Sequence, residues 1–193
     1  MKKSVISAFL SFILLFCFFG CTQKEKSFIS TSGPEVIKFK DLPFELDQVK
    51  LLDGPFKHAR DLNVDVLLNT YEPDRFLAKF RSEAGLESKA EHYHGWEDDT
   101  IAGHSLGHYL SACSLMYRAT GDKRFFERVN YIVDELAECQ KTDGDGYIGA
   151  FHDGKHIFEE EIAWGDIRSQ RFNLNGLWAP YYTIHKVFKG LLD

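Results

Sequence analysis

Hydrophobic residues recur along this chain with two different spacings, which divide it into an N-terminal segment and a longer helical part. Between residues 35 and 52 they recur every two or three positions, a strand-like spacing that Pro43 interrupts. We expect one or two short strands here, or an extended arm that packs on the main body. From Phe56 onward the apolar residues are three or four positions apart, as on one face of a helix.

Several segments with this helical spacing are separated by residues that favour turns. We predict helices over residues 56–69, from Pro73 to about Phe80, over 100–119 and 122–140, and from Pro180 onward, with a further short helix near 158–164. Thr100 is the expected N-cap of the third helix. The apolar faces of these helices contain Phe56, Leu62, Val66, Phe76, Leu77, Phe80, Phe125, Ile132, Leu136, Ile184, Phe188, Leu191 and Leu192.

The arrangement of these segments predicts an all-α fold. Long helices that are joined by short turns, without a heptad repeat, are typical of part of a helical toroid. About six helices do not close a toroid, and the last helical pattern continues to Asp193 without a cap. We therefore interpret residues 35–193 as the N-terminal portion of a truncated helical domain.

The first twenty residues have the pattern of an export signal. Two lysines precede an apolar run from Val5 to Phe19, which is short for a transmembrane helix. The sequence FFGC, which ends at Cys21, resembles the bacterial lipobox, in which the cysteine is acylated and becomes the mature N-terminus. Phe18 stands where Leu is usual, so an ordinary cleaved signal peptide is the alternative.

These features predict the organisation of the N-terminus and the location of the protein. We expect a lipoprotein signal peptide over residues 1–20 and a polar tether over residues 21–34. The predicted location is outside the cytoplasm, anchored to the outer membrane by lipid on Cys21, at the cell surface or on the periplasmic face.

Composition narrows the classes of partner. The chain has 193 residues, of which 44% are hydrophobic and 15% aromatic, enough for a globular domain with a core. Its net charge of -6 and the lack of a basic stripe argue against binding to nucleic acid. Cys113 and Cys139 are the cysteines of the globular part, and a helical hairpin around Gly121 would separate them by about 15 Å. We therefore expect both to be buried as small apolar residues, without a disulfide.

The stretch from His92 to Tyr117 contains the residues best suited to chemistry. A loop rich in His, Trp, Glu and Asp leads into the helix of His104 and His108, which are four positions apart and share a face. This pair has three alternative roles: zinc ligation, sugar contacts, or structural hydrogen bonds. Against zinc ligation, HSLGH lacks the Glu of the HExxH metalloprotease helix. Gly103 and Gly107 each cost a helix about 1 kcal/mol. Close helix packing or close approach of a ligand would explain that cost.

Three consecutive carboxylates precede this helix and divide into two predicted roles. Asp98 and Asp99 are expected to cap the helix and interact with its dipole. Trp96 and Glu97 are the better pocket candidates, because indole stacks on sugar faces and a carboxylate accepts hydrogen bonds from hydroxyls. The aromatic residues toward the C-terminus could line subsites, but core positions are the default interpretation of Trp164, Trp178, Tyr181 and Tyr182.

Seven runs of residues resemble, in the same order, the N-terminal part of the β-L-arabinofuranosidases of glycoside hydrolase families 127 and 146. Because several long motifs occur in the family's order, the resemblance is specific, and it covers about residues 41–193. The runs are VKLLDGPF (49–56), YEPDRFLA (71–78), FRSEAGL (80–86), GWE (95–97), GHSLGHYLSA (103–112), ATGD (119–122) and YTIHK (182–186).

The resemblance implies a fold and a reaction. The fold would be a partial (α/α)6 barrel, with the short β or extended arm before it and β-sandwich domains after it in the family. The reaction would be retaining removal of L-arabinofuranose from arabinose-containing plant oligosaccharides or polysaccharides. In the family, a cysteine nucleophile is held by zinc with other cysteines and a glutamate, beside a glutamate acid/base.

Those groups come later in the family's chain than Asp193. We therefore expect no catalytic residue in this segment, no zinc bound by it although the full-length family has zinc, and no activity of the segment alone. By the same resemblance, His185 matches a histidine that hydrogen-bonds the sugar in the −1 subsite; a core histidine is the alternative. The predicted substrate-binding residues are His185, His108, His104, Glu97 and Trp96.

Two other functions are open. The first is another (α/α)6 glycosidase, such as a glycuronyl hydrolase, with Glu97 or Asp99 as the catalytic carboxylate. The second is a non-catalytic glycan-binding lipoprotein, whose loop aromatics hold an oligosaccharide.

Overall fold

The structure is a computed structural model that describes residues 41–98 and 100–193. The chain divides into two compact units, residues 1–42 and residues 43–193, and only residues 41 and 42 of the first unit are described. The predicted signal peptide, the tether with Cys21, residues 35–40 of the arm, and Asp99 lie outside the described residues. In the described part of the chain, no helix has the length and apolar character needed to cross a membrane.

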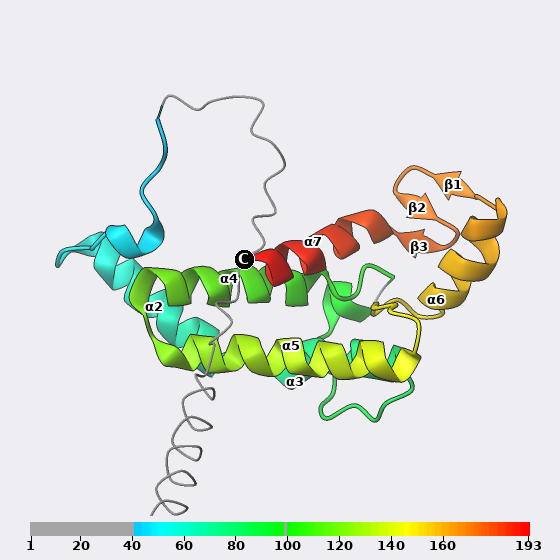
Figure 1. The fold of residues 1–193 in the computed structure, drawn as a ribbon, viewed down its shortest axis with the longest axis horizontal. Coiled ribbons are helices and arrows are strands. Elements are labelled where there is room, and N and C mark those ends of the chain that lie inside the picture. Colours follow the sequence, from blue (N-terminus) through cyan, green and yellow to red (C-terminus); the bar gives the residue numbers. More distant parts are fainter. Residues whose placement is uncertain (1–40, 99) are drawn as a thin grey trace, which may run out of the picture. The chain divides into compact units, whose positions relative to one another are not determined.

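Residues 43–193 fold mainly into helices that pack around a central helix, α4 (Figure 1). α4 packs against both α5 and α7, and α3 packs against α5 and α4. The predicted helices and the mainly helical class are therefore confirmed, and paired helices of this kind are typical of part of a helical barrel. The long helices are α2 (Pro55–Asn69), α3 (Pro73–Glu83), α4 (His104–Thr120), α5 (Lys123–Asp143) and α7 (Pro180–Leu192).

Short elements fill the connections between these helices. Two 3-10 helices, η1 (Leu46–Gln48) and η2 (Gly95–Asp98), precede α2 and α4. Between α5 and α7 the chain forms α6 (Gly154–His156), the π-helical turn η3 (Ile157–Glu161) and the 3-10 helix η4 (Ile162–Trp164). An antiparallel sheet follows, in the order β1 (Ser169–Gln170), β2 (Asn173–Leu174) and β3 (Leu177–Trp178).

This sheet was not predicted from the sequence. β2 and β3 are joined by Asn175-Gly176, both with positive φ, which is the preferred two-residue turn of a hairpin. The Asn-Gly pair was therefore a readable turn signal, in a segment for which no strand was predicted. The predicted short helix near residues 158–164 is present in η3 and η4.

The helix boundaries follow from proline and glycine positions. Pro55, Pro73 and Pro180 occupy the first turns of α2, α3 and α7, where their missing N–H costs nothing. Gly121 ends α4 in the left-handed region at φ 70°, and the Asp122 side chain then accepts a hydrogen bond from the Arg124 amide to start α5. The predicted turn between these two helices is confirmed.

Four helices contribute to the core. Both cysteines are buried within it and free of disulfides, as predicted, and burial raises the pKa of the Cys113 thiol to about 11. The largest core side chains include Leu77 and Phe80 from α3, Leu106 and Leu110 from α4, Phe125, Ile132 and Leu136 from α5, and Val187 from α7.

Glycine allows α4 and α7 to approach closely. A Cβ built on Gly107 would lie 2.2 Å from the Lys186 carbonyl carbon, and one built on Gly190 would lie 2.6 Å from the Gly107 carbonyl oxygen. Both are closer than real carbon contacts permit. Of the two explanations for Gly107, close helix packing is therefore the correct one.

Two expectations about apolar residues were wrong, and a third was right in one of its two forms. Residues 41–52 contain no strand; η1 within this segment contacts α4, as expected of an arm, although the hydrophobic side chains of the segment are mostly exposed. The Phe56, Leu62 and Val66 side of α2 is exposed, because α2 contacts the core through Val64, Leu67 and Leu68. α7 is buried at Thr183, Val187 and Gly190, since the close approach of α4 favours small side chains, while Phe188, Leu191 and Leu192 are exposed.

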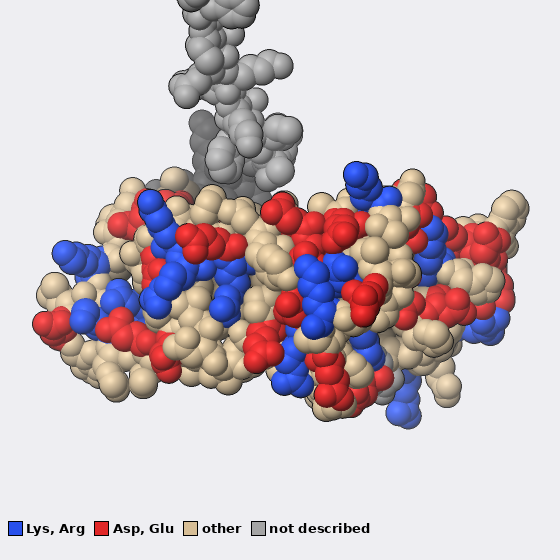
Figure 2. Space-filling view, turned by 90° about the horizontal axis from the view of Figure 1, so that it is seen from below, with Lys and Arg blue, Asp and Glu red and all other residues tan. Residues whose placement is uncertain are grey.

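Charged side chains of both signs are interspersed on the face shown in Figure 2. Lys, Arg, Asp and Glu alternate there, so this face has no continuous basic area. Nucleic-acid binding would need such an area to neutralise successive phosphates.

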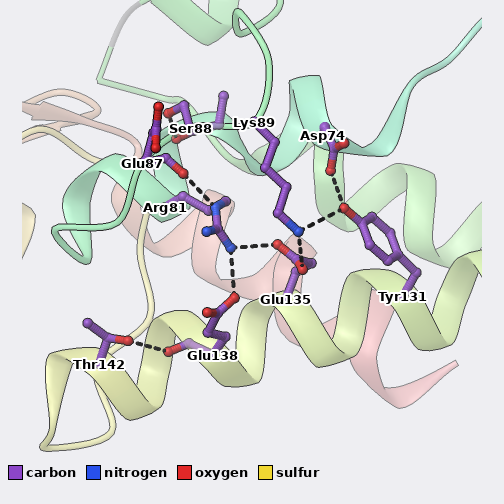
Figure 3. A network of polar contacts seen from close by, with 10 residues as sticks. Asp74, Arg81, Glu87, Ser88, Lys89, Tyr131, Glu135, Glu138 and Thr142 are labelled. Carbon is purple, nitrogen blue, oxygen red and sulfur yellow. Dashed lines mark hydrogen bonds and ion pairs between the residues drawn. The ribbon is translucent and has the colours of Figure 1, made fainter.

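A partly buried ion-pair network joins α3 and the following loop to α5 (Figure 3). Arg81 Nη1 lies 2.6 Å from Glu135 and 2.8 Å from Glu138, and Lys89 Nζ lies 2.6 Å from the other Glu135 oxygen. Arg81 Nε donates to the Glu87 carbonyl, so the guanidinium also holds the loop. The network holds the base of the loop that leads to η2.

Candidate functional site

A cavity of about 410 Å³ lies between α2, α3, η2 and α4. One side is aromatic, and the other presents polar side chains: Glu97, Ser105 and His108, with His94 and Trp96 nearby. An apolar surface with a few converging polar groups is the usual form of a small-molecule site. The pyranose or furanose ring of a sugar suits such a cavity, because it has an apolar face and hydroxyl edges.

The aromatic side is built around Phe76 of α3. The ring centroid of Phe76 lies 4.6 Å from that of Tyr93 and 4.9 Å from that of Tyr109, with Tyr71 within 6 Å. The hydroxyl of Tyr109 donates to the Leu67 carbonyl at 2.7 Å. The aromatic side is therefore held in place by α2, α3 and α4 together.

Glu97 is the buried carboxylate of the site, with 7% of its surface exposed. The Gly103 amide donates to Glu97 Oε2 at 2.7 Å, and the Ser105 amide donates to Oε1 at 3.2 Å. These amides belong to the first turn of α4, which has no intrahelical acceptors for them. Glu97 therefore caps α4 from outside the helix, and it also lines the cavity.

This cap explains why α4 begins later than predicted. Thr100 is not the N-cap: its hydroxyl accepts a hydrogen bond from the Trp178 amide, and residues 100–103 form turns. Gly103 takes the N-cap position with φ 99°, a conformation that favours glycine. The capping role expected of Asp98 thus belongs to Glu97 for α4, while Asp98 accepts from the Gly95 amide in η2.

His104 is buried and bound to the scaffold. Its Nδ1 lies 2.9 Å from the Ile101 carbonyl oxygen, which can only accept, so Nδ1 carries the proton. The same nitrogen lies 3.2 Å from Glu97 Oε1. These contacts favour the structural interpretation of His104, whose ring is not among those lining the cavity.

His108 is the histidine that faces the cavity. Its Nε2 lies 3.1 Å from the hydroxyl of Tyr182 on α7. Partial burial, with the nearby Lys186 and His104, lowers the pKa of His108, so its imidazole is neutral at pH 7. A neutral imidazole can donate through one nitrogen and accept through the other, which suits a hydroxyl ligand.

The other two predicted substrate-binding residues, Trp96 and His185, differ in their position relative to the cavity. Trp96 is 64% exposed at the edge of the cavity, and its ring centroid lies 6.0 Å from that of Trp178. His185 is exposed on α7 and does not line the cavity. The structure therefore brings Trp96, Glu97 and His108 together, and leaves His185 apart from them.

Other cavity residues were missed or placed in the core. Tyr71 and Tyr93 line the cavity, and the Tyr-Glu-Pro and His-Tyr-His sequences around them gave only a weak signal. The default assignment of four aromatic residues to the core was wrong, because all of them are exposed: Trp164, Trp178, Tyr181 and Tyr182. Tyr182 reaches His108 because α7 lies against α4.

A cluster of three polar side chains, His92, His94 and Asp98, lies next to the cavity. His92 Nε2 and His94 Nδ1 lie 2.7 and 3.1 Å from the same oxygen, Oδ1 of Asp98. Hydrogen bonds from His92, the Gly95 amide and His94 lower the pKa of Asp98 to about 2. The hydrogen bond with Asp98 raises the pKa of His94.

The cysteines of this chain do not fit a zinc site. Cys113 and Cys139 are buried in the core on two helices, and neither joins a group of potential ligands. Within residues 41–98 and 100–193, the group of three or more side chains that could hold a metal ion is His92, His94 and Asp98. His104 and His108 are not part of it.

An aromatic cavity with converging imidazole, carboxylate and hydroxyl groups in a helical domain suits a sugar ligand. The family model of the β-L-arabinofuranosidase GH127 catalytic domain matches residues 48–193, which is most of the chain and includes every residue that lines the cavity. The chain therefore belongs to this glycoside hydrolase family. No curated protein matches the chain.

Proposed function

We propose that this chain forms one wall of the substrate pocket in a retaining β-L-arabinofuranosidase that acts on arabinose-containing plant glycans. The carrying observation is the 410 Å³ cavity, which lies wholly within the part that matches the GH127 catalytic domain. Its aromatic side and its neutral His108 are suited to the two kinds of surface that a furanose presents.

Each polar residue has a separate task in this proposal. His108 exchanges hydrogen bonds with a sugar hydroxyl, and the Tyr182 hydroxyl orients its Nε2. Trp96 provides an exposed indole at the cavity edge for stacking. Glu97 holds the first turn of α4, and so sets the position of His108, while His185 would meet the substrate from the exposed side of α7.

The chemical step is assigned to groups outside residues 41–193. The zinc of the family would hold and activate a thiolate, and the two core cysteines here do not match that role. We therefore propose that this segment binds sugar but does not cleave it alone. The lipid anchor on Cys21 is likewise proposed from the lipobox-like sequence, and unchanged membrane attachment of Cys21→Ala would contradict it.

Kinetics of the full-length enzyme test the pocket assignment. His108→Ala should lower kcat/KM on a small aryl arabinofuranoside about tenfold or more, because one hydrogen bond to the sugar is lost. His185→Ala tests the −1 subsite assignment in the same assay. His58→Ala is the matched control, since His58 is exposed on α2 away from the cavity. Unchanged kinetics of His108→Ala and of His185→Ala would remove both histidines from the substrate pocket.

The exposed aromatic residues support a second candidate, a glycan-binding protein without catalysis. Trp96 and Trp178 lie beside one another, and Trp164 is also exposed. If this chain alone folds and binds arabino-oligosaccharides tightly, with binding lost in Trp96→Ala, this second candidate gains.

The hydrogen bonds of Glu97 bear on the glycuronyl hydrolase alternative. Both carboxylate oxygens already accept from backbone amides of α4, whereas a general acid must reach the leaving-group oxygen. Rescue of a full-length Glu97→Ala variant by azide or formate would nevertheless favour that alternative.

A further inference from the structure

We propose that His92, His94 and Asp98 form a binding site for a divalent transition-metal ion, Zn²⁺ foremost. The site borders the 410 Å³ cavity through His94, but metal binding there does not depend on the proposed glycosidase activity. One atom from each side chain lies within 4.8 Å of the other two, a spacing that a single ion can bridge.

The local backbone brings the three groups together. His92 and His94 are two positions apart in a segment without helix, and Gly95 turns the chain at φ 83° into η2. The Gly95 amide donates to Asp98 Oδ2 at 2.8 Å, which leaves Oδ1 facing both imidazoles. Asp98 is therefore oriented by the backbone and not only by the histidines.

A further carboxylate orients His94. Glu91 Oε1 lies 3.2 Å from His94 Nε2, while His94 Nδ1 faces Asp98. Histidine ligands of metal ions commonly donate their second ring N–H to a carboxylate in this way, which leaves the other nitrogen free to coordinate. Glu91 thus supplies a carboxylate partner for the second ring nitrogen of His94.

The donor set selects the class of ion. Two imidazoles and one carboxylate suit Zn²⁺ and its neighbours in the first transition series, whereas Ca²⁺ and Mg²⁺ prefer oxygen ligands alone. Access is open on both sides, since His94 lines the 410 Å³ cavity and His92 and Asp98 line a second cavity of about 400 Å³. Water or a substrate hydroxyl can complete the coordination.

A bound ion would affect the neighbouring cavity through the backbone. Residues 92–98 include Trp96 at the cavity edge and Glu97 under α4. An ion that ties His92 to Asp98 would restrain this loop, and by mass action it would stabilise the folded chain.

Zinc titration of the metal-free chain against a chromophoric chelator tests the proposal. We expect one equivalent of Zn²⁺ to bind, and His92→Ala/His94→Ala to bind at least about 100-fold more weakly, since loss of even outer-shell partners costs 10–100-fold. His58→Ala, which removes an exposed histidine on α2, should bind like the unaltered chain. Far-UV circular dichroism without metal checks that each variant is folded.

Cobalt substitution identifies the ligand atoms. A Co²⁺ complex at this site should show d–d absorption without a thiolate charge-transfer band, whereas binding at Cys113 or Cys139 would show that band. Equal zinc affinity of the double variant, a thiolate band, or a folded unaltered chain that binds no zinc would each overturn the proposal. In the last case, Asp98 would only link the two imidazoles by hydrogen bonds.

Discussion

Glu97 and Asp98 are adjacent carboxylates of the same short helix, yet their surroundings differ completely. Glu97 is buried and accepts hydrogen bonds from two backbone amides of α4. Asp98 is exposed and interacts with two imidazoles and one amide of its own loop. The comparison shows that burial and the reach of nearby donors, and not residue type, assign one carboxylate to the scaffold and the other to a surface site.

Glu97→Ala should lower the stability of the fold more than the other substitutions. A smaller effect would contradict the scaffold role of Glu97. Removal of the carboxylate leaves the Gly103 and Ser105 amides without an acceptor in a buried place. We expect the free energy of unfolding to fall by about 3 kcal/mol. Chemical denaturation followed by circular dichroism measures it. Glu97→Gln, which retains one acceptor oxygen, should lose less, and equal stability of all three proteins would show that the cap contributes nothing.

Gly103→Ala should lower the free energy of unfolding by an intermediate amount, because Gly103 is one of the two residues whose amides donate to Glu97. Gly103 has φ 99°, and an added Cβ would lie 2.9 Å from Phe80 Cζ. Backbone strain and a clash with a core ring should together cost about 2 kcal/mol. Gly85→Ala is the matched control, since Gly85 also has positive φ but open space around it, so the difference between the two isolates the clash. A larger loss for Gly85→Ala would contradict this account.

Asp98→Asn should have the smallest effect, and one that depends on pH. The pKa of Asp98 is lowered from 3.8 to about 2, so its stabilisation is present above pH 3.8 and lost as the pH falls toward 2. The pKa of His94 is raised above 6.5, so its contribution is present below pH 6.5 and lost as the pH rises through the raised value. In thermal melts with a chelator present, the difference in melting temperature between Asp98→Asn and the unaltered chain should therefore be largest between pH 3.8 and pH 6.5. A difference that is the same at every pH would exclude this pair as its source.

Much of the fold could be predicted because its signals are local. Pro73, Pro180 and Gly121 mark helix ends through backbone geometry that each residue imposes by itself. The burial of Phe76, Leu77 and Phe80 followed from their spacing. The exposed side of α2 could not be predicted in this way, because an apolar stripe does not reveal how much of it a partner covers.

The site was predicted less completely than the fold. Trp96, Glu97 and His108 were predicted as pocket residues because their residue types suit sugar binding, and all three line one cavity. The capping role was assigned to the wrong carboxylate: Asp98 was expected to cap the helix, but Glu97 does so. Residue type does not separate two adjacent carboxylates of the same short helix. The contact between His108 and Tyr182 joins positions 74 residues apart, and no local pattern reports it.

The sequence by itself determined the helices, their order, the family and the residue types around the cavity, because these depend on propensity, periodicity and motif. Only the tertiary structure decided which carboxylate caps α4 and which faces the imidazoles of His92 and His94. The physical reason is that hydrogen bonds and burial depend on distances between segments. The turn at Gly95 and the left-handed backbone of Gly103 set those distances.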